Sequence, residues 1–267
     1  MAIGTWRTAA DASIYLMLEL NAEPALTYLA TLGARTETRV TLSSFVGKVV
    51  AETLRRHPEI NCVLRFGRLY PRRTVDLFFQ VATDPLGQDL SGTTIRQADT
   101  KPVETIAAEL QADVARIRRE GDIAFKRMKS VFGALPGVLA APLLRLSGFV
   151  SYTLNLWTPL HGTPRDPFGS VMLTNIGSLG LEVAFAPLVP YSRVPLVIAI
   201  GALRERPTVV DRQVTVARVI TLCMTVDHRL VDGVQVGRMA RTVQDMFANP
   251  EGELEARAGE PVRSARC

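Results

Sequence analysis

The strongest constraint on the fold is the apolar run VARVITLCMTV at residues 216–226, which ends at Asp227 and His228 and leads into a helical pattern at 233–250. This order predicts a buried strand, a tight polar turn and a helix with apolar residues along one face. A histidine in such a turn has two interpretations. It either belongs to an ordinary polar turn, or it is a general base held by a rigid one.

The rest of the sequence mixes strand and helix patterns along its whole length. Helices are predicted at 41–61, with Ser43 or Ser44 as the N-cap, and at 102–121. We predict an α/β fold with one domain over residues 1–256 and a flexible tail at 257–267. No glycine-rich loop follows the first strand, which argues against a dinucleotide-binding fold. Further strands are predicted at 13–21, 75–83, 170–177 and 194–203.

Charge and composition argue against several classes of function. The net charge is +5, but lysine and arginine are spread along the chain rather than gathered in a stripe. We therefore expect no nucleic-acid partner. The three histidines and three cysteines are isolated from one another, so no metal site is predicted. The N-terminus lacks a basic start followed by an apolar core, which favours a cytoplasmic location.

Residues 130–157 are strongly apolar and carry a single charge, Arg145. A membrane span needs about 20 apolar residues, but prolines and glycines divide this segment and Arg145 lies near its middle. We favour burial within the protein or in an oligomer contact. A pair of helices on a membrane surface is the less favoured alternative. In either case we expect the segment to be covered, because an apolar patch of this kind is seldom left bare on a soluble monomer.

Several motifs together resemble the catalytic core of the dihydrolipoyl acyltransferases, a family related to chloramphenicol acetyltransferase. The turn at 227–233 reads D-H-R-L-V-D-G, which is similar to the family's signature. TNIGSLG at 174–180 is similar to its hydroxyl-bearing strand end, and the helix at 43–61 is similar to F-x-x-K-A-x-x-x-A-L-x-x-x-P-x-x-N. The resemblance implies a mixed-sheet sandwich with helices on one face, assembled as a homotrimer.

The resemblance also implies a site. His228 would be the general base and Thr174, from the neighbouring subunit, would donate its hydroxyl to the oxyanion. Asp232 would support the turn through an arginine near the N-terminus, for which Arg7 is the candidate although its spacing is short. Coenzyme A would be a substrate, and no metal would take part. The supporting residues would be Asp227 and Arg229, which orient the loop, together with Gly233 and Asn175.

The chain departs from the family in ways that leave two functions open. The motifs begin near residue 12, so we expect no lipoyl group on this chain and an acyl donor that is coenzyme A or a separate lipoyl or carrier protein. An apolar insertion at about 124–168 replaces a short linker and could build a larger assembly. We favour a stand-alone acyltransferase. The alternative is a weakly active or inactive structural protein that uses this fold to build an oligomer or cage.

Overall fold

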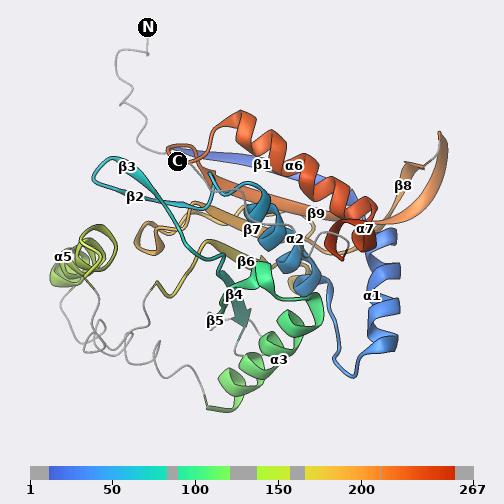
Figure 1. The fold of residues 1–267 in the computed structure, drawn as a ribbon, viewed down its shortest axis with the longest axis horizontal. Coiled ribbons are helices and arrows are strands. Elements are labelled where there is room, and N and C mark those ends of the chain that lie inside the picture. Colours follow the sequence, from blue (N-terminus) through green and yellow to red (C-terminus); the bar gives the residue numbers. More distant parts are fainter. Residues whose placement is uncertain (1–11, 83–89, 121–136, 157–165, 211, 256–267) are drawn as a thin grey trace, which may run out of the picture.

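A mixed sheet forms the centre of the computed structural model, which describes residues 12–82, 90–120, 137–156, 166–210 and 212–255 (Figure 1). The sheet has seven strands in the order β1-β9-β7-β6-β4-β5, and β8 pairs with β9. The pairs β4–β6 and β6–β7 are parallel and the other pairs are antiparallel. The bounds are β1 Ser13–Asn21, β4 Leu77–Ala82, β5 Leu90–Ile95, β6 Val171–Asn175, β7 Leu196–Ile200, β8 Arg204–Val210 and β9 Gln213–Asp227.

Helices α1, α2, α3, α6 and α7 cover one face of this sheet, whereas α5 lies to one side of it, against η3 and η6 (Figure 1). The main core lies between the covering helices and the strands, where Phe45 and Phe247 pack edge to face with ring centroids 5.1 Å apart. A smaller apolar cluster around Met172 and Val197 lies apart from this main core. The helices are α1 Glu23–Arg35, α2 Leu42–Arg56, α3 Val103–Glu120, α5 Gly137–Gly148, α6 Gly233–Ala248 and α7 Pro250–Leu254.

The predicted strand at 216–226 is the longer strand β9. It pairs with β1 along one edge and with β7 and β8 along the other. Residues 219–227 are all buried, whereas 213–216 are exposed in the hairpin with β8. The apolar run therefore marks the buried half of the strand, as expected for a strand between two neighbours.

Helix α2 begins at Leu42, and its N-cap lies two residues before Ser43. Thr41 is the cap: its hydroxyl accepts a hydrogen bond from Ser44 N at 3.2 Å, and Ser44 Oγ accepts one from Thr41 N at 3.0 Å. The prediction of Ser43 or Ser44 as the N-cap is therefore wrong. Ser44 is the third residue of the helix and bonds back to the cap. The hairpin β2 (Cys62–Arg65) and β3 (Arg68–Pro71) was also not predicted.

The apolar segment is helical where the structure describes it. Helix α5 runs through Pro142, and a π-helical turn, η3 (Phe149–Thr153), follows directly. Gly148 and Tyr152 are buried, whereas Leu146 and Phe149 are exposed. The outer face of this segment is therefore not buried within the chain, and its burial in an oligomer contact stays a prediction. None of the helices described is long and apolar enough to cross a membrane.

Candidate active site

The turn that carries His228 is fixed by backbone hydrogen bonds. Asp227 O accepts from Leu230 N at 3.0 Å and from Val231 N at 3.1 Å. Asp227 N donates to Pro195 O, and His228 N donates to Ala12 O, each at 2.9 Å. Because Leu230 and Val231 are also buried in the core, the turn is held from both sides before any ligand binds.

Asp227 and Arg229 form an ion pair within this turn. The carboxylate is 7% exposed and receives hydrogen bonds from Arg229 N at 3.0 Å, Nε at 2.9 Å and Nη2 at 2.6 Å. A two-pronged contact of this kind fixes orientation as well as charge. Both residues therefore orient the loop, and neither carboxylate oxygen reaches the imidazole through a described hydrogen bond.

His228 itself is exposed, and its ring is oriented by one contact. Nδ1 lies 2.8 Å from Val231 O. A carbonyl oxygen only accepts hydrogen bonds, so Nδ1 must carry a proton. In the neutral ring Nε2 then holds a lone pair, and a general base accepts its proton on such a nitrogen. The geometry therefore leaves His228 able to accept a proton at Nε2.

The side chain of Asp232 bonds to the start of helix α6. Its Oδ1 accepts from Gln235 N at 2.8 Å, and Gln235 Oε1 accepts from Asp232 N at 2.8 Å, which caps α6. Arg7 lies outside the described residues. A Cβ added to Gly233 would meet no atom within 4 Å. Close packing within the chain therefore does not require glycine there.

Thr174 and Asn175 end strand β6. Asn175 Nδ2 donates to Ser43 Oγ at 2.9 Å, and its Oδ1 accepts from Ser178 N at 3.1 Å. Thr174 is half-buried, and its hydroxyl makes no hydrogen bond to another residue of the described chain. A cavity of about 310 Å³ lies beside this strand end, lined by residues including Ser43, Asn175, Ser178 and Gly201.

The strand register places His228 and Thr174 at opposite ends of the sheet. Thr174 pairs with Ala199, and Ala199 pairs with Cys223. His228 lies five residues beyond Cys223 along the chain, which is roughly 17 Å at about 3.4 Å per residue. One chain therefore brings together Asp227, His228, Arg229 and Asp232, and it holds Thr174 and Asn175 elsewhere.

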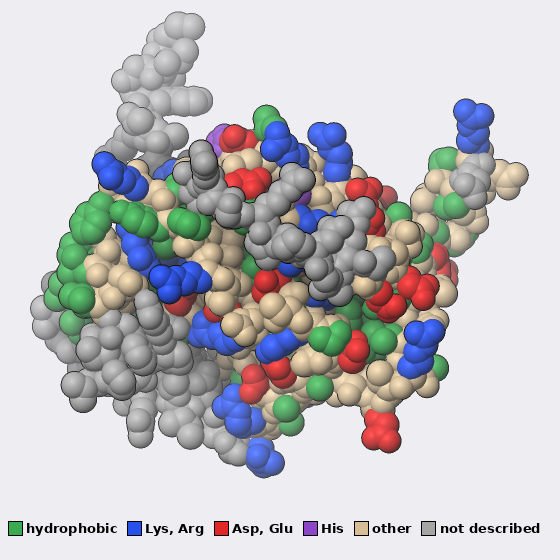
Figure 2. Space-filling model, in the orientation of Figure 1, with side chains coloured by type: hydrophobic (Ala, Val, Ile, Leu, Met, Phe, Trp, Pro, Cys, Tyr) green, Lys and Arg blue, Asp and Glu red, His purple; other side chains and the backbone are tan. Residues whose placement is uncertain are grey.

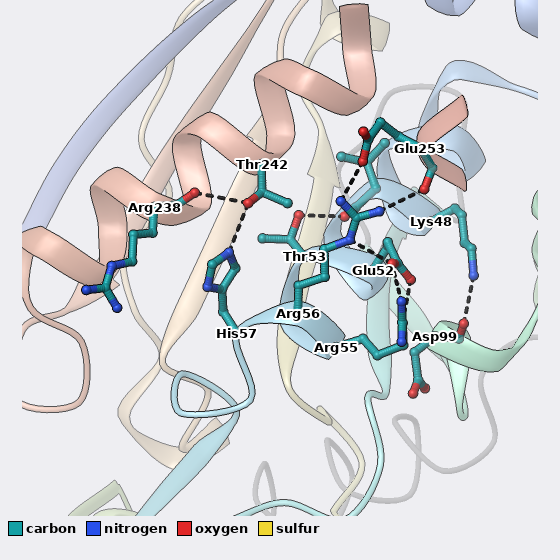
Figure 3. Close-up of polar contacts among 11 residues, drawn as sticks. Lys48, Glu52, Thr53, Arg55, Arg56, His57, Asp99, Arg238, Thr242 and Glu253 are labelled. Carbon is teal, nitrogen blue, oxygen red and sulfur yellow. Dashed lines mark hydrogen bonds and ion pairs between the residues drawn. The ribbon is translucent and has the colours of Figure 1, made fainter. Parts of the chain in front are cut away.

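Polar contacts that were not predicted join helix α2 to α6 and α7 (Figure 3), and the largest group of them forms a network around Glu52. Glu52, which is 4% exposed, accepts from Arg55 Nε at 2.7 Å and from Arg56 Nε at 2.8 Å. Arg56 also donates to Glu253 Oε2 at 2.6 Å. Burial alone would raise the pKa of Glu52, but the hydrogen bonds from both arginines hold it below its ordinary value. These bonds tie α2 to α7, the short helix that follows α6 in the chain.

His57 and Lys48 make two further contacts that are separate from this network (Figure 3). His57 Nε2 lies 2.9 Å from Thr242 Oγ1, and that hydroxyl donates to Arg238 O at 3.1 Å. The hydroxyl therefore accepts from the imidazole, so His57 carries its proton on Nε2. Burial lowers the pKa of His57 and also that of Lys48, whose Nζ donates to Asp99 O at 2.7 Å. Across the described ranges, no group of three or more residues could hold a metal ion.

Comparison with known proteins gives consistent results. The sequence model described as 2-oxoacid dehydrogenases acyltransferase (catalytic domain) matches residues 6–131 and 168–254. The dihydrolipoyllysine-residue succinyltransferase component of the Haemophilus influenzae 2-oxoglutarate dehydrogenase complex is 22% identical over 238 residues, which is 87% of this chain and 47% of that protein. An acetyltransferase component from Acholeplasma laidlawii is 34% identical over 82 residues, 31% of this chain and 15% of its own. The chain thus spans less than half of these relatives.

Solved structures share the fold. A probable dihydrolipoamide acetyltransferase from Listeria monocytogenes has a TM-score of 0.65 at 16% identity, covering 94% of this chain and 88% of that one. The dihydrolipoamide acetyltransferase of Azotobacter vinelandii has a TM-score of 0.66 at 14% identity, covering 92% and 85%. That enzyme was studied for the roles of a serine, a histidine and an asparagine in its catalytic mechanism. Residues 132–167 of this chain lie between the two stretches matched by the family.

Proposed function

Because the chain belongs to the family of 2-oxoacid dehydrogenases acyltransferase catalytic domains, we propose that it transfers an acyl group between coenzyme A, or a carrier thioester, and an acceptor thiol, hydroxyl or amine. The observation that carries this proposal is the state of His228. Its Nδ1 is committed to Val231 O and its exposed ring keeps Nε2 as an acceptor. A fixed base with a free lone pair is what deprotonation of a nucleophile requires.

The reaction follows from this arrangement. His228 Nε2 takes the proton of the acceptor nucleophile, which then attacks the thioester carbonyl and forms a tetrahedral oxyanion. Collapse of that intermediate expels the thiolate of coenzyme A, and the protonated imidazole returns the proton to it. A hydroxyl donor aimed at the oxyanion is worth about 2.7–4 kcal/mol in sites of this kind. Thr174 is our candidate for that donor.

Thr174 would donate its hydroxyl to the oxyanion in the site that contains His228 of the neighbouring subunit. The two residues of one chain are roughly 17 Å apart along the strand direction, which is too far for both to contact one acyl group. A cyclic trimer brings the β6 end of one protomer to the β9 end of the next. The Thr174 hydroxyl is half-buried and has no hydrogen-bond partner among the described residues, which supports this arrangement.

Positioning of the base falls to the residues around it. Asp227 and Arg229 hold the loop through their ion pair, and Asp232 holds the start of α6. In the Azotobacter vinelandii enzyme the histidine and asparagine that were studied have the spacing of His228 and Asp232 here. This spacing supports a role for Asp232 close to the reacting groups, in addition to its cap.

The test is thiol release from acetyl-coenzyme A, measured with a panel of acceptors that includes free dihydrolipoamide. We expect His228→Ala and Thr174→Ala each to lose at least 100-fold in activity, since one oxyanion donor alone contributes about that much. The matched control is His57→Ala, which changes a histidine outside the proposed site. Equal activity of His228→Ala and the unsubstituted protein would remove His228 from the mechanism.

Mixing the two inactive variants tests the shared site. If His228 and Thr174 come from different protomers, random mixed trimers regain about a quarter of full activity. If both act within one chain, mixing restores nothing. A uniform assembly with no turnover across the acceptor panel would instead favour the structural function of this fold.

A further inference from the structure

We propose that the outer surface of α5, η3 and the tip of the β2–β3 hairpin docks onto a membrane that contains anionic phospholipid. We call this surface the α5 face. It lies on residues outside the two stretches matched by the family, together with the hairpin beside them. Its members are Phe66, Arg68, Arg145, Leu146, Phe149 and Leu156.

The α5 face is apolar on the outside because its inner side is anchored. Tyr152 is 6% exposed and packs edge to face on Tyr191, with ring centroids 6.2 Å apart. Leu146 and Leu156 point the other way, each 59% exposed. Burying a leucine side chain stabilises by about 1.5–3 kcal/mol, and this chain leaves both of these outside its own core.

The hairpin and the insertion form one surface. Phe66 is 68% exposed, and its ring centroid lies 6.3 Å from that of Phe149, with an angle of 88° between the ring planes. Arg65 Nη2 donates to Asn155 Oδ1 at 3.2 Å, which ties the two segments together. The apolar side chains of the hairpin and of the α5–η3 segment therefore belong to one surface that these two contacts hold together.

The charge of this surface has one sign. Arg68, Arg73 and Arg145 are exposed, and the sequence has no aspartate or glutamate at 62–73 or at 123–165. Among the described residues, Asp76 pairs with Arg96 at 2.8 Å and Asp166 pairs with Arg72. Figure 2 shows hydrophobic side chains gathered over the α5 side of the molecule with basic side chains beside them.

This combination selects the occupant. A second copy docking through the same surface would bring Arg68 and Arg145 against arginines of equal charge, which is unfavourable. An anionic lipid surface neutralises the arginines while the leucine and phenylalanine side chains enter the boundary between headgroups and acyl chains. No spanning helix is needed for such a contact. The surface is therefore suited to lie on a bilayer.

The docking surface is connected to the end of the sheet that carries the base. Tyr191, on which Tyr152 packs, lies in η6 (Pro190–Ser192), which leads directly into β7. Pro195 O, just before β7, accepts from Asp227 N at 2.9 Å. His228 takes no part in the α5 face itself, so His228→Ala protein should bind vesicles as the unsubstituted protein does.

The experiment is co-sedimentation of the full chain with vesicles of phosphatidylcholine alone or mixed with phosphatidylglycerol. We expect sedimentation with the anionic vesicles at low salt and little with the neutral ones. Arg68→Gln with Arg145→Gln should lower partitioning about 25-fold, at about five-fold for each arginine near the surface. Leu146→Gln with Leu156→Gln should lower it at least ten-fold.

The matched control is Val214→Gln with Val216→Gln, which changes two valines that are 77% and 70% exposed on the β8–β9 hairpin. This pair should bind vesicles normally. Absence of sedimentation with anionic vesicles would overturn the proposal, and so would an equal loss in the control pair. Light scattering that shows an assembly broken by the leucine variants, but no vesicle binding, would assign the surface to a protein contact instead.

Discussion

Helices α2 and α5 reverse the usual relation between polarity and burial. Helix α2 carries Lys48 and Glu52 at 7% and 4% exposure, deep in the protein. Helix α5 has one charged residue, yet its Leu146 is 59% exposed. The difference teaches that burial depends on what surrounds a helix as well as on its composition.

The physical reason lies in the partners that each helix finds. Buried charges are tolerated only when they are paired and hydrogen-bonded, and Glu52 receives its bonds from Arg55 and Arg56. Helix α5 has no second layer over its outer face among the described residues, so its apolar side chains remain at the surface. The first helix is completed within the chain, and we propose that the second is completed by a membrane.

Substitution of Glu52 should have the largest effect on this comparison. Glu52→Ala leaves two arginines partly buried without their shared carboxylate, and we expect the free energy of unfolding to fall by about 3–5 kcal/mol. Urea unfolding measures this. Glu205→Ala, which removes an exposed glutamate from β8, is the control and should stay within about 0.5 kcal/mol. A loss below 1 kcal/mol in Glu52→Ala would show that the network contributes little.

A matched pair of leucines sharpens the comparison directly. Leu54 of α2 is 2% exposed, so Leu54→Ala should lower the free energy of unfolding by about 2–5 kcal/mol. Leu146→Ala on α5 should change it by no more than about 0.5 kcal/mol. Thermal or urea unfolding of the two variants side by side decides the matter. Comparable losses would mean that Leu146 is packed by the protein itself.

The smallest expected effect is a dependence of stability on pH through His57. Burial holds the pKa of His57 below its ordinary value of 6.5, so the unfolded chain binds a proton more readily than the folded one. Stability should therefore fall as pH decreases from 6.5 towards the lowered pKa of the folded state. The urea midpoint compared at pH 7.5 and pH 5.5 measures the slope. His57→Gln should flatten it, and an unchanged slope would contradict the prediction.

Much of the candidate site could be predicted because its signals are local. The apolar run before Asp227 and the helical pattern after Gly233 predicted a strand, a turn and a helix, and these are β9, the 227–231 turn and α6. The capping pair of Asp232 and Gln235 was also readable, since both residues stand at the required spacing. The pairing of Asp232 with an arginine near the N-terminus stays a prediction, because Arg7 lies outside the described residues.

Other features could not be predicted, because they depend on pairing between distant segments. Nothing local in β6 and β9 shows that Thr174 lies level with Cys223 rather than with His228; that follows from the register through β7. The polar network from Glu52 to Glu253 joins residues far apart in sequence. Likewise, the apolar composition of 137–156 did not tell which side chains face Tyr191 and which face outwards.

The sequence by itself determined most of the buried strands and the longer helices, the histidine at the end of the central strand and the family to which the chain belongs. It did so because periodicity, caps and turn residues act over a few positions. The tertiary structure alone decided that His228 and Thr174 lie at opposite ends of one sheet. It also decided that the charged side chains of Lys48 and Glu52 on α2 are buried and that Leu146 on α5 is exposed. Those outcomes depend on which distant surfaces meet, and the free energy of that contact is a property of both surfaces together.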